Sequence, residues 1–350
     1  MTSEIQIMRW QIQSSTAVVV TLTFGLLVWG GHPSEAWAQA PVNIDPLPSW
    51  NAGPAKAAIL DFVAQATKAG SPGFVPTAER IAVFDNDGTL WPEYPVPFEL
   101  AFTFDAAKVR MANRPELKDQ PAYQALAAGD VARLTADHLK LVRQLLVDTH
   151  TGQTTDEFQQ SASNWIATAR HPRFNRLYKD CTYLPMQEVL RYLRASGYRT
   201  YLVSGGVADF MRAWAWPVYG IPPEQVIGTV FKTRYGLQGD KPVLTILPEL
   251  AFLDDKGGKP VGIQAFIGQR PVMCFGNSDG DHEMLQWTTI GRRPSFGLIV
   301  HHTDAVREYA YDAKPQGSGQ LIKALAAAPQ RGWTVVNMQQ DWNILFTPQK

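Results

Sequence analysis

Ile81-Ala82-Val83-Phe84-Asp85-Asn86-Asp87-Gly88-Thr89-Leu90 is the most informative segment of this sequence. It starts as a short apolar run with β propensity and then changes abruptly to acidic, amide and glycine residues, which is typical of a buried strand that ends in a polar loop. Ligands of open parallel α/β sheets bind just beyond the carboxyl ends of the strands, so Asp85 and Asp87 are expected to face a crevice. Gly88 permits a tight turn there, and Thr89 is suited to cap the following segment.

Similar strand-to-loop transitions recur later in the chain. Arg199–Val203 runs into Ser204-Gly205-Gly206, and Pro271–Phe275 runs into the polar loop Gly276–Asp281. A further apolar strand is expected at Phe296–Val300. Helix patterns lie between these strands, and such alternation predicts a mostly parallel sheet with helices on both faces. The predicted fold class is therefore α/β, with a Rossmann-like three-layer core.

The intervening elements are expected as follows. Pro185 opens a helix that Gly197 ends, and a second helix surrounds Asp209 to Trp216. A strand near Val226 to Phe231 leads into a turn-rich stretch through Asp255, for which no regular element is predicted. Pro260 to Ile267 is a candidate short helix.

A helical region interrupts the core after the first strand. Trp91–Pro97 contains three prolines, which rule out a helix and a central strand there. From that point apolar residues recur at helical spacing, and Thr154 with Glu157 forms a capping-box signature. We interpret residues 92–183 as an inserted helical cap and residues 41–91 and 184–350 as the α/β core.

The N-terminal segment is typical of an export signal. Ala17–Trp29 carries no charge but is too short to indicate a membrane span. Two small-x-small sequences follow it, at residues 36–38 and 38–40. Residues 1–40 are therefore predicted to be a signal peptide, and the mature protein to be periplasmic or secreted without stable membrane association. An uncleaved anchor is the alternative, because Arg9 is the only basic residue in the first sixteen.

Composition narrows the classes of partner. Lys plus Arg and Asp plus Glu total 32 each, and no basic run is present, so we expect no nucleic-acid partner. The hydrophobic fraction of 45% over 350 residues allows a large core. Two cysteines, Cys181 and Cys274, exclude a disulfide scaffold.

The polar loops resemble the motifs of the haloacid dehalogenase superfamily, in particular its phosphoserine phosphatase-like branch with a helical cap after the first motif. Asp85 to Leu90 matches D-x-D-G-T-[LV], and Ser204 after an apolar strand resembles the second motif. Gly276 to Asp281 resembles G-D-x-x-x-D, with Asn277 in place of the first acid and Asp281 at the second.

The resemblance implies a set of roles for these residues. Asp85 would be the nucleophile, and Asp87 the general acid and base. The Ser204 hydroxyl, the Gly205 amide and a lysine would bind the phosphoryl oxygens. Lys259, which lies 18 residues before Asn277 and directly before a candidate helix, is preferred over Lys256 as that lysine.

The resemblance also implies Mg²⁺, held by Asp85, the backbone carbonyl of Asp87 and the Asn277/Asp281 loop. Mg²⁺ favours anionic oxygen ligands, so the amide at residue 277 leaves open whether Asn277 or Asp281 completes the site.

The expected function is an exported, Mg²⁺-dependent phosphatase that acts on a small phosphomonoester, because the second acid of the first motif is absent from halide-releasing members. Alternatives are a phosphonate-cleaving enzyme using a cap lysine (Lys108, Lys118 or Lys140), a phosphotransferase, and a binding protein weakened in catalysis by Asn277. Weaker candidates for substrate contact are Glu93 and the pair His301-His302.

Overall fold

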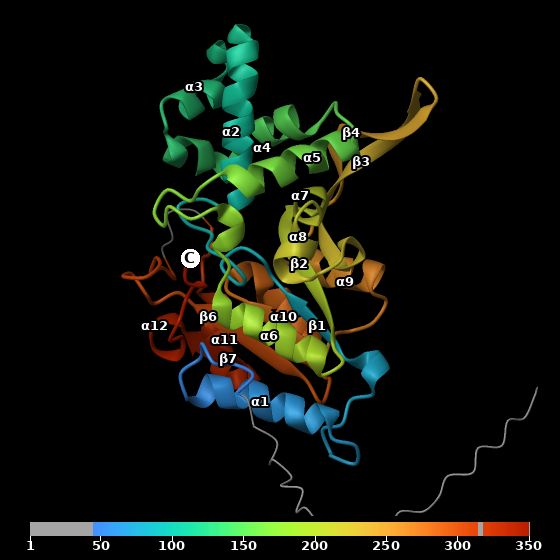
Figure 1. Ribbon diagram of the computed structural model, residues 1–350, viewed down its shortest axis with the longest axis vertical. Helices are drawn as coiled ribbons and strands as arrows, with labels where there is room; N and C mark the ends of the chain where they lie inside the picture. The colour runs from blue at the N-terminus through green and yellow to red at the C-terminus, as the bar shows by residue number, and fades with distance from the viewer. Residues whose placement is uncertain (1–44, 314–317, 350) are drawn as a thin grey trace, which may run out of the picture. The chain divides into compact units, whose positions relative to one another are not determined.

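The strand predicted from Ile81 lies at the centre of a seven-stranded sheet (Figure 1). The protein is represented by a computed structural model that describes residues 45–313 and 318–349. The strand order is β4-β3-β2-β1-β5-β6-β7, and only β4 runs antiparallel to its neighbour. The strands are β1 (Ile81–Phe84), β2 (Arg199–Val207), β3 (Val226–Gln238), β4 (Lys241–Phe252), β5 (Met273–Gly276), β6 (Phe296–His301) and β7 (Thr334–Asn337). The predicted α/β class is confirmed.

Helices connect and cover these strands. The α-helices are α1 (Pro54–Thr67), α2 (Phe98–Asn113), α3 (Pro121–Ala127), α4 (Val131–His150), α5 (Thr155–Thr168), α6 (Leu184–Ala195), α7 (Ala208–Arg212), α8 (Ala215–Tyr219), α9 (Gly258–Phe266), α10 (His282–Thr289), α11 (Lys323–Arg331) and α12 (Met338–Asp341). Short 3₁₀ turns are η1 (Thr77–Glu79), η2 (Pro115–Asp119), η3 (Tyr178–Asp180), η4 (Pro223–Gln225) and η5 (Asp279–Asp281).

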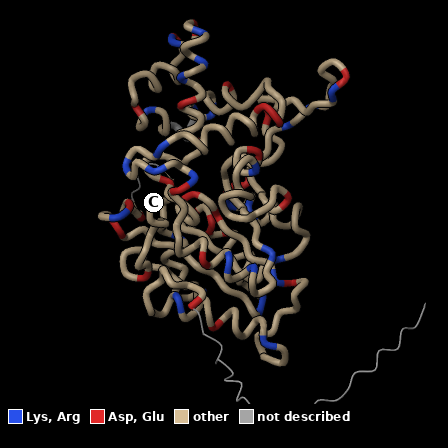
Figure 2. The backbone as a smooth tube through the Cα atoms, viewed as in Figure 1, with Lys and Arg blue, Asp and Glu red and all other residues tan. Residues whose placement is uncertain are grey.

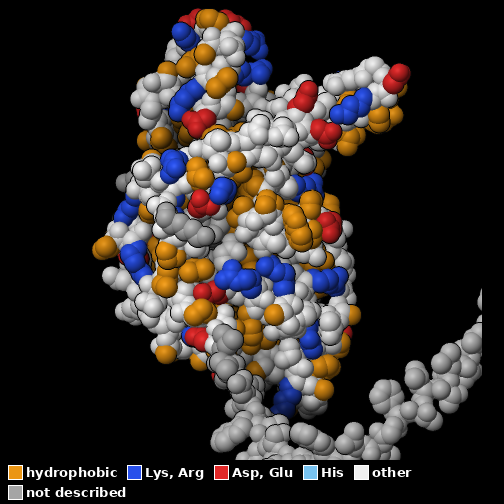
Figure 3. Space-filling view, in the orientation of Figure 1, with side chains coloured by type: hydrophobic (Ala, Val, Ile, Leu, Met, Phe, Trp, Pro, Cys, Tyr) orange, Lys and Arg blue, Asp and Glu red, His pale blue; other side chains and the backbone are white. Residues whose placement is uncertain are grey.

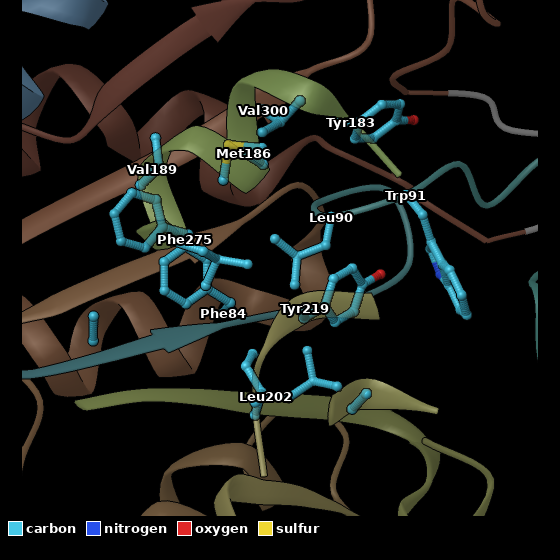
Figure 4. Packing of buried hydrophobic residues seen from close by; sticks show 14 of the residues in the cluster. Phe84, Leu90, Trp91, Tyr183, Met186, Val189, Leu202, Tyr219, Phe275 and Val300 are labelled. Carbon is cyan, nitrogen blue, oxygen red and sulfur yellow. The ribbon is translucent and has the colours of Figure 1, made fainter. Parts of the chain in front are cut away.

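The central strand contributes alternate side chains to two hydrophobic clusters, one on each face of the sheet. Ala82 and Phe84 join the cluster that contains residues of α1 and α6, whereas Ile81 and Val83 join the cluster that contains residues of α9, α10 and α11. Successive strand residues point to opposite faces, so both faces of this strand must be apolar. This is the predicted three-layer arrangement, and Figure 4 shows Phe84 stacked on Phe275 of the neighbouring strand, with ring centroids 4.2 Å apart.

The prediction of an irregular, turn-rich stretch between residues 232 and 255 is wrong. β3 and β4 form a long antiparallel hairpin joined at Gly239 and Asp240 (Figure 1). Prolines in β4 obscured the strand pattern, but β4 is an edge strand, where proline is tolerated. The outer part of the hairpin also exposes hydrophobic side chains, such as Tyr235 and Leu237, so it lacks a buried face that a sequence pattern reveals (Figure 3).

Two smaller expectations also needed correction. The helix predicted around Asp209 to Trp216 is divided into α7 and α8. The C-terminal elements α11, β7 and α12 were not predicted, and β7 completes the sheet beside β6. The helices predicted to start near Pro185 and Pro260 are present as α6 and α9.

Helices α2 to α5 lie together on one side of the sheet (Figure 1). α2, α3 and α4 share a hydrophobic cluster of their own, built around residues such as Phe104, Tyr123 and Leu145. α5 begins with the predicted capping box, in which Thr154 and Glu157 bond reciprocally. The interpretation of residues 92–183 as a cap domain stays a prediction.

The predicted signal peptide, residues 1–40, lies outside the described residues. Among residues 45–313 and 318–349, no helix is both long enough and apolar enough to cross a membrane. Lys and Arg lie interspersed with Asp and Glu along the chain (Figure 2), consistent with their equal totals.

Candidate active site

β1 and β5 end at the same level, whereas β2, on the other side of β1, continues to Val207. Phe84 pairs with Leu202 of β2 on one side and with Phe275 of β5 on the other. Asp85 directly follows β1, and its backbone N–H donates to the Phe275 carbonyl at 2.9 Å. The parallel register therefore places the Asp85 loop between the C-terminal part of β2 and the loop that follows β5, as expected for a ligand site at the carboxyl ends of strands.

Lys259 joins two of the predicted acids. Its Nζ atom lies 2.6 Å from Asp85 Oδ1 and 2.6 Å from Asp281 Oδ1, and its side chain is only 3% exposed. It comes from the first turn of α9, whereas the competing Lys256 is exposed in the preceding loop. Lys259 is thus the lysine that contacts the strand-end carboxylates.

Buried charges at these positions stabilise one another. Burial by itself would lower the pKa of Lys259, but the Asp281 and Asp85 carboxylates outweigh burial and raise it. The other oxygen of Asp281 accepts hydrogen bonds from the backbone N–H groups of Asn277 (2.9 Å) and Ser278 (3.1 Å). Asp281 therefore fixes both the lysine and the start of the loop after β5, because a buried carboxylate requires such partners.

Asp87 is held by an indole from its own loop. Trp91 Nε1 donates to Asp87 Oδ1 at 2.7 Å, and the Gly88 N–H donates to the Trp91 carbonyl at 2.8 Å. The Trp91 ring is buried against Phe98 and Trp214, with centroids 4.3 Å away in each case (Figure 4 shows Trp91 beside Tyr219). Burial raises the pKa of Asp87 to about 7, with the Trp91 hydrogen bond acting against it. A carboxyl with such a pKa can donate and accept protons near neutral pH.

Asn86, between the two aspartates, has a structural partner. Its side-chain oxygen accepts a hydrogen bond from Tyr219 OH at 3.0 Å, and both groups are buried. This hydrogen bond connects residues 85–90, the motif loop, to α8. Asn86 is thereby directed into the packing between β1 and α8, while its two acidic neighbours face the strand-end loops.

Ser204, Gly205 and Gly206 were predicted to form a loop, but they lie within β2, where the parallel register with β3 shifts between Ser204 and Val207. Ser204 is buried, and its hydroxyl accepts a hydrogen bond from the Gly206 N–H at 3.3 Å. The Gly205 carbonyl accepts a hydrogen bond from Thr229 Oγ1 at 2.7 Å, so β3 supports this segment. These hydrogen bonds of Ser204 and Gly205 stay within β2 and β3, whereas Lys259 contacts the carboxylates directly.

Glu99 is a buried acid near the site that the sequence did not indicate. Its Oε2 atom accepts a hydrogen bond from the Val207 N–H at 2.9 Å, and its Oε1 atom lies 3.3 Å from His150 Nε2. Glu99 thus links α2 and α4 to Val207, the last residue of β2. No local sequence pattern marks a helical glutamate as buried, because burial here depends on how α2 packs.

Asn277, at the position of the missing acid, contacts a different glutamate. Its Nδ2 atom donates to Glu93 Oε1 at 2.7 Å, and its Oδ1 atom accepts from Thr89 Oγ1 at 3.2 Å. Glu93 also accepts a hydrogen bond from Tyr311 OH at 2.7 Å, and burial raises the pKa of Glu93. Asn277 and Glu93 are both buried, so Glu93 forms part of the wall of the site.

His302 supports the motif loop from β6. Its Nε2 atom lies 2.7 Å from the Gly88 carbonyl and its Nδ1 atom 3.0 Å from Glu308 Oε2. Both partners are acceptors, so both ring nitrogens donate. Burial alone would lower the pKa of His302, but Glu308 outweighs burial and raises it. His302 stacks on Tyr311, with ring centroids 4.4 Å apart, and therefore has a structural role, whereas His301 is half-buried.

Asp254 is a second acid that the sequence did not single out. It is fully buried five residues before Lys259, and neither of its carboxylate oxygens has a hydrogen-bond partner among the described residues. Burial raises the pKa of Asp254 to about 7, although Lys259 acts in the opposite direction. Asp254 lies two residues after the end of β4, a strand that the sequence did not predict.

The oxygen atoms at the strand ends fit a hard cation. Asp85 offers a carboxylate, Asp87 a backbone carbonyl and Asn277 an amide oxygen, while both oxygens of Asp281 have protein partners. Among residues 45–313 and 318–349, no group of three His, Cys, Asp or Glu side chains is arranged to hold a metal ion. A cation at this site would therefore rely on amide and backbone oxygens beside Asp85, which suits Mg²⁺ because that ion keeps several waters.

Comparisons with solved structures give low identities. A functionally unknown protein from Anaerococcus prevotii is 18% identical, over 71% of this chain and 86% of that chain, with a TM-score of 0.49. A protein of unknown function from Bordetella pertussis is 16% identical, over 74% of this chain and 99% of that chain, with a TM-score of 0.47. A phosphoserine phosphohydrolase-like protein from Francisella tularensis is 13% identical, over 63% and 87% respectively, with a TM-score of 0.34.

No curated protein matches the chain. The model of one family does match, over residues 82–286, and that range includes every predicted site residue from Asp85 to Asp281. The range is more than half of the sequence. It starts within β1 and ends within α10, so it covers β2 and the loops that follow β1 and β5. The chain belongs to the haloacid dehalogenase-like hydrolase family.

Proposed function

We propose that this hydrolase is a phosphatase that cleaves a small phosphomonoester through an aspartyl-phosphate on Asp85. The observation that carries the proposal is the buried triad in which Lys259 lies 2.6 Å from both Asp85 and Asp281. A fixed cation beside a carboxylate reduces the repulsion that a phosphate dianion would meet on approach. Asp87, on the same loop and with its pKa raised to about 7, supplies the proton donor that an alcohol leaving group needs.

The first step breaks the ester bond. A carboxylate oxygen of Asp85 attacks phosphorus, the bond between phosphorus and the ester oxygen breaks, and Asp87 donates its proton to the departing oxygen. The Trp91 hydrogen bond holds Asp87 in one orientation for this transfer. The Ser204 hydroxyl and the Gly205 N–H, in the C-terminal part of β2, are the proposed donors to the phosphoryl oxygens.

The second step releases phosphate. Asp87, now a carboxylate, accepts a proton from water as the water oxygen attacks phosphorus, and the bond from phosphorus to Asp85 breaks. Lys259 neutralises charge on Asp85 as it becomes a carboxylate again. Mg²⁺ bound by Asp85, the Asp87 carbonyl and Asn277 would supply additional positive charge at the phosphoryl group.

Specificity and location complete the proposal. Helices α2 to α5 are proposed to act as a cap that selects the substrate, and the N-terminal segment is proposed to direct export. Fractionation of cells that express the full chain tests the second point. We expect a mature protein in the exported fraction whose N-terminus, read by mass spectrometry, lies near residue 39 or 41, whereas an intact N-terminus in the membrane fraction would indicate an anchor.

Phosphate release from an aryl phosphate, with and without Mg²⁺, tests the activity. We expect Mg²⁺-dependent turnover that Asp85→Asn lowers by about a thousandfold or more and Asp87→Asn by about 10²- to 10⁴-fold. Asp61→Asn, on the exposed side of α1, is the matched control for loss of a carboxylate. If a folded protein that binds Mg²⁺ released no phosphate from several monoesters, the phosphatase proposal would be rejected in favour of the phosphonate or binding alternatives.

A further inference from the structure

The replacement of an acid by Asn277 removes one negative charge from the site, and a buried carboxylate lies directly behind that residue. Glu93 Oε1 accepts a hydrogen bond of 2.7 Å from Asn277 Nδ2. Glu93 is 3% exposed and Asn277 is 1% exposed. The contact joins residues 184 positions apart, so the loop after β1 and the loop after β5 meet at this pair.

Two glycines leave the space that the pair occupies. A Cβ atom on Gly88 would lie 2.0 Å from Asn277 Nδ2 and 2.5 Å from Glu93 Oε1, and a Cβ on Gly319 would lie 2.3 Å from the same glutamate oxygen. Both glycines have positive φ angles, of 74° and 84°, which few other residues adopt. Tyr311 OH donates to Glu93 Oε1 from a third segment. The carboxylate is therefore held against the amide from several sides.

This contact has a consequence for the opposite end of the amide. An N–H group that donates to a carboxylate polarises its amide and makes the carbonyl oxygen more negative, because hydrogen bonds in series strengthen one another. Glu93 contacts Asn277 at the amide nitrogen, whereas the Asn277 oxygen accepts a hydrogen bond of 3.2 Å from Thr89, which follows Asp87 by two residues. An amide oxygen has a second lone pair, which can bind a cation. A more negative amide oxygen is a better ligand for a hard cation.

We propose that Glu93 is a positioning residue that replaces the missing motif charge: it orients and polarises Asn277 so that the amide oxygen serves as a ligand for a divalent cation. The inference rests on the metal site of the proposed function. In this arrangement Asn277 contacts the cation, and Glu93 supplies the negative charge through its hydrogen bond to Asn277. Residues that hydrogen-bond to metal ligands commonly act in this way.

A charge exchange between the two residues tests the proposal. Asn277→Asp would place two carboxylates in contact, Glu93→Gln would remove the charge while keeping an acceptor, and the double variant would restore one negative charge and one amide in reversed order. The measurements are Mg²⁺ affinity by calorimetry without substrate, and the melting temperature of the metal-free protein in EDTA.

We expect Glu93→Gln to weaken Mg²⁺ binding about tenfold or more. Asn277→Asp should lower the metal-free melting temperature by roughly 2–4 °C or more, and the double variant should recover both the melting temperature and the Mg²⁺ affinity. Recovery is the decisive result, because two unrelated structural defects would add instead of cancelling.

Tyr311→Phe is the matched control. It removes a hydrogen bond to the same Glu93 oxygen but leaves the charge and the Asn277 contact, so we expect Mg²⁺ affinity within about twofold of the wild-type value. Equal weakening by Tyr311→Phe and Glu93→Gln would overturn the role of the charge.

The remaining outcomes separate the two proposals. Unchanged Mg²⁺ affinity in Glu93→Gln, or no recovery in the double variant, would overturn the positioning role alone. Absence of Mg²⁺ binding by the wild-type protein would reject the metal site of the proposed function and this role with it.

Discussion

Lys259 Nζ and Asp85 Oδ1 lie 2.6 Å apart in a buried ion pair, although 174 positions separate the two residues. The pair links α9 to the end of β1. A lysine at this distance both stabilises the buried carboxylate and neutralises charge beside the predicted nucleophile. Stability and activity at this site are therefore coupled through one ammonium group.

Lys259→Met should impair both properties. The change leaves Asp85 and Asp281 buried without their cation, and such a loss typically costs about 3–5 kcal/mol. We therefore expect the free energy of unfolding near pH 7 to decrease by this amount and phosphatase activity to be lost. Urea denaturation measures the first effect. Lys256→Met removes an exposed lysine from the preceding loop and is the matched control, with an expected effect within about 0.5 kcal/mol. Similar curves for both variants would contradict the buried role of Lys259.

Trp91→Phe should lower kcat more than it changes KM. It removes the donor to Asp87 Oδ1 but keeps an aromatic ring between Phe98 and Trp214. We expect kcat to fall about 10- to 100-fold, because Asp87 loses its fixed orientation, while the far-ultraviolet circular dichroism spectrum stays like that of the wild-type protein.

The control for that change is Trp214→Phe. The Nε1 atom of Trp214 is buried and has no hydrogen-bond partner among the described residues, so the substitution removes a ring of the same kind without removing a contact to Asp87. An equal fall in kcat for the two variants would show that aromatic packing, and not the hydrogen bond, is what matters.

Gly88→Ala should destabilise the protein and abolish activity. Gly88 has a φ of 74°, and a Cβ there would lie 2.0 Å from Asn277 Nδ2. We expect a loss of at least about 2 kcal/mol in unfolding free energy, from backbone strain together with overpacking. Gly70→Ala is the control, since Gly70 has a φ of 79° but no atom within 4 Å of the added Cβ. A loss no larger than that of Gly70→Ala would argue against a closely packed motif loop.

Asp254→Asn should change how stability depends on pH. The pKa of Asp254 is about 7 in the fold, so between its ordinary value of 3.8 and pH 7 the folded protein binds more protons than the unfolded protein. Stability from this group therefore falls as pH rises through that window and is constant above it. Across this window the free energy of unfolding should fall by roughly 1.4 kcal/mol per pH unit, a few kcal/mol in all.

The asparagine variant lacks this contribution, so its stability relative to the wild-type protein should increase from pH 4 to pH 7. Urea denaturation at several pH values measures the difference. Asp255→Asn, at the exposed neighbouring position, is the matched control for removing a carboxylate from this loop. A constant difference between the Asp254 variant and the wild-type protein across pH would show that Asp254 is ionised in the fold.

Much of the core was predictable because its signals are local. An apolar run followed by polar and glycine residues indicates a buried strand and the loop after it, and this holds for β1 and β5. For β2 the strand was predicted, but the loop predicted at residues 204–206 is part of the strand, which continues to Val207. Alternation of strands and helices then indicates a parallel sheet, whose strand ends share one edge. The β3–β4 hairpin was missed because its outer part exposes both faces, so no alternation of hydrophobic residues marks it.

The sequence by itself determined the α/β class, the position of Asp85, Asp87 and Asn277 just after strands, and the family resemblance. Only the tertiary structure brought Lys259, which the sequence already favoured over Lys256, into contact with Asp85. It also paired Asn277 with Glu93 and buried Glu99 and Asp254. The physical reason is the separation along the chain over which each kind of interaction acts. Periodicity and turn chemistry act between residues a few positions apart, whereas burial and charge pairing depend on which distant segments pack together, as 174 residues separate Asp85 from Lys259 and 184 separate Glu93 from Asn277.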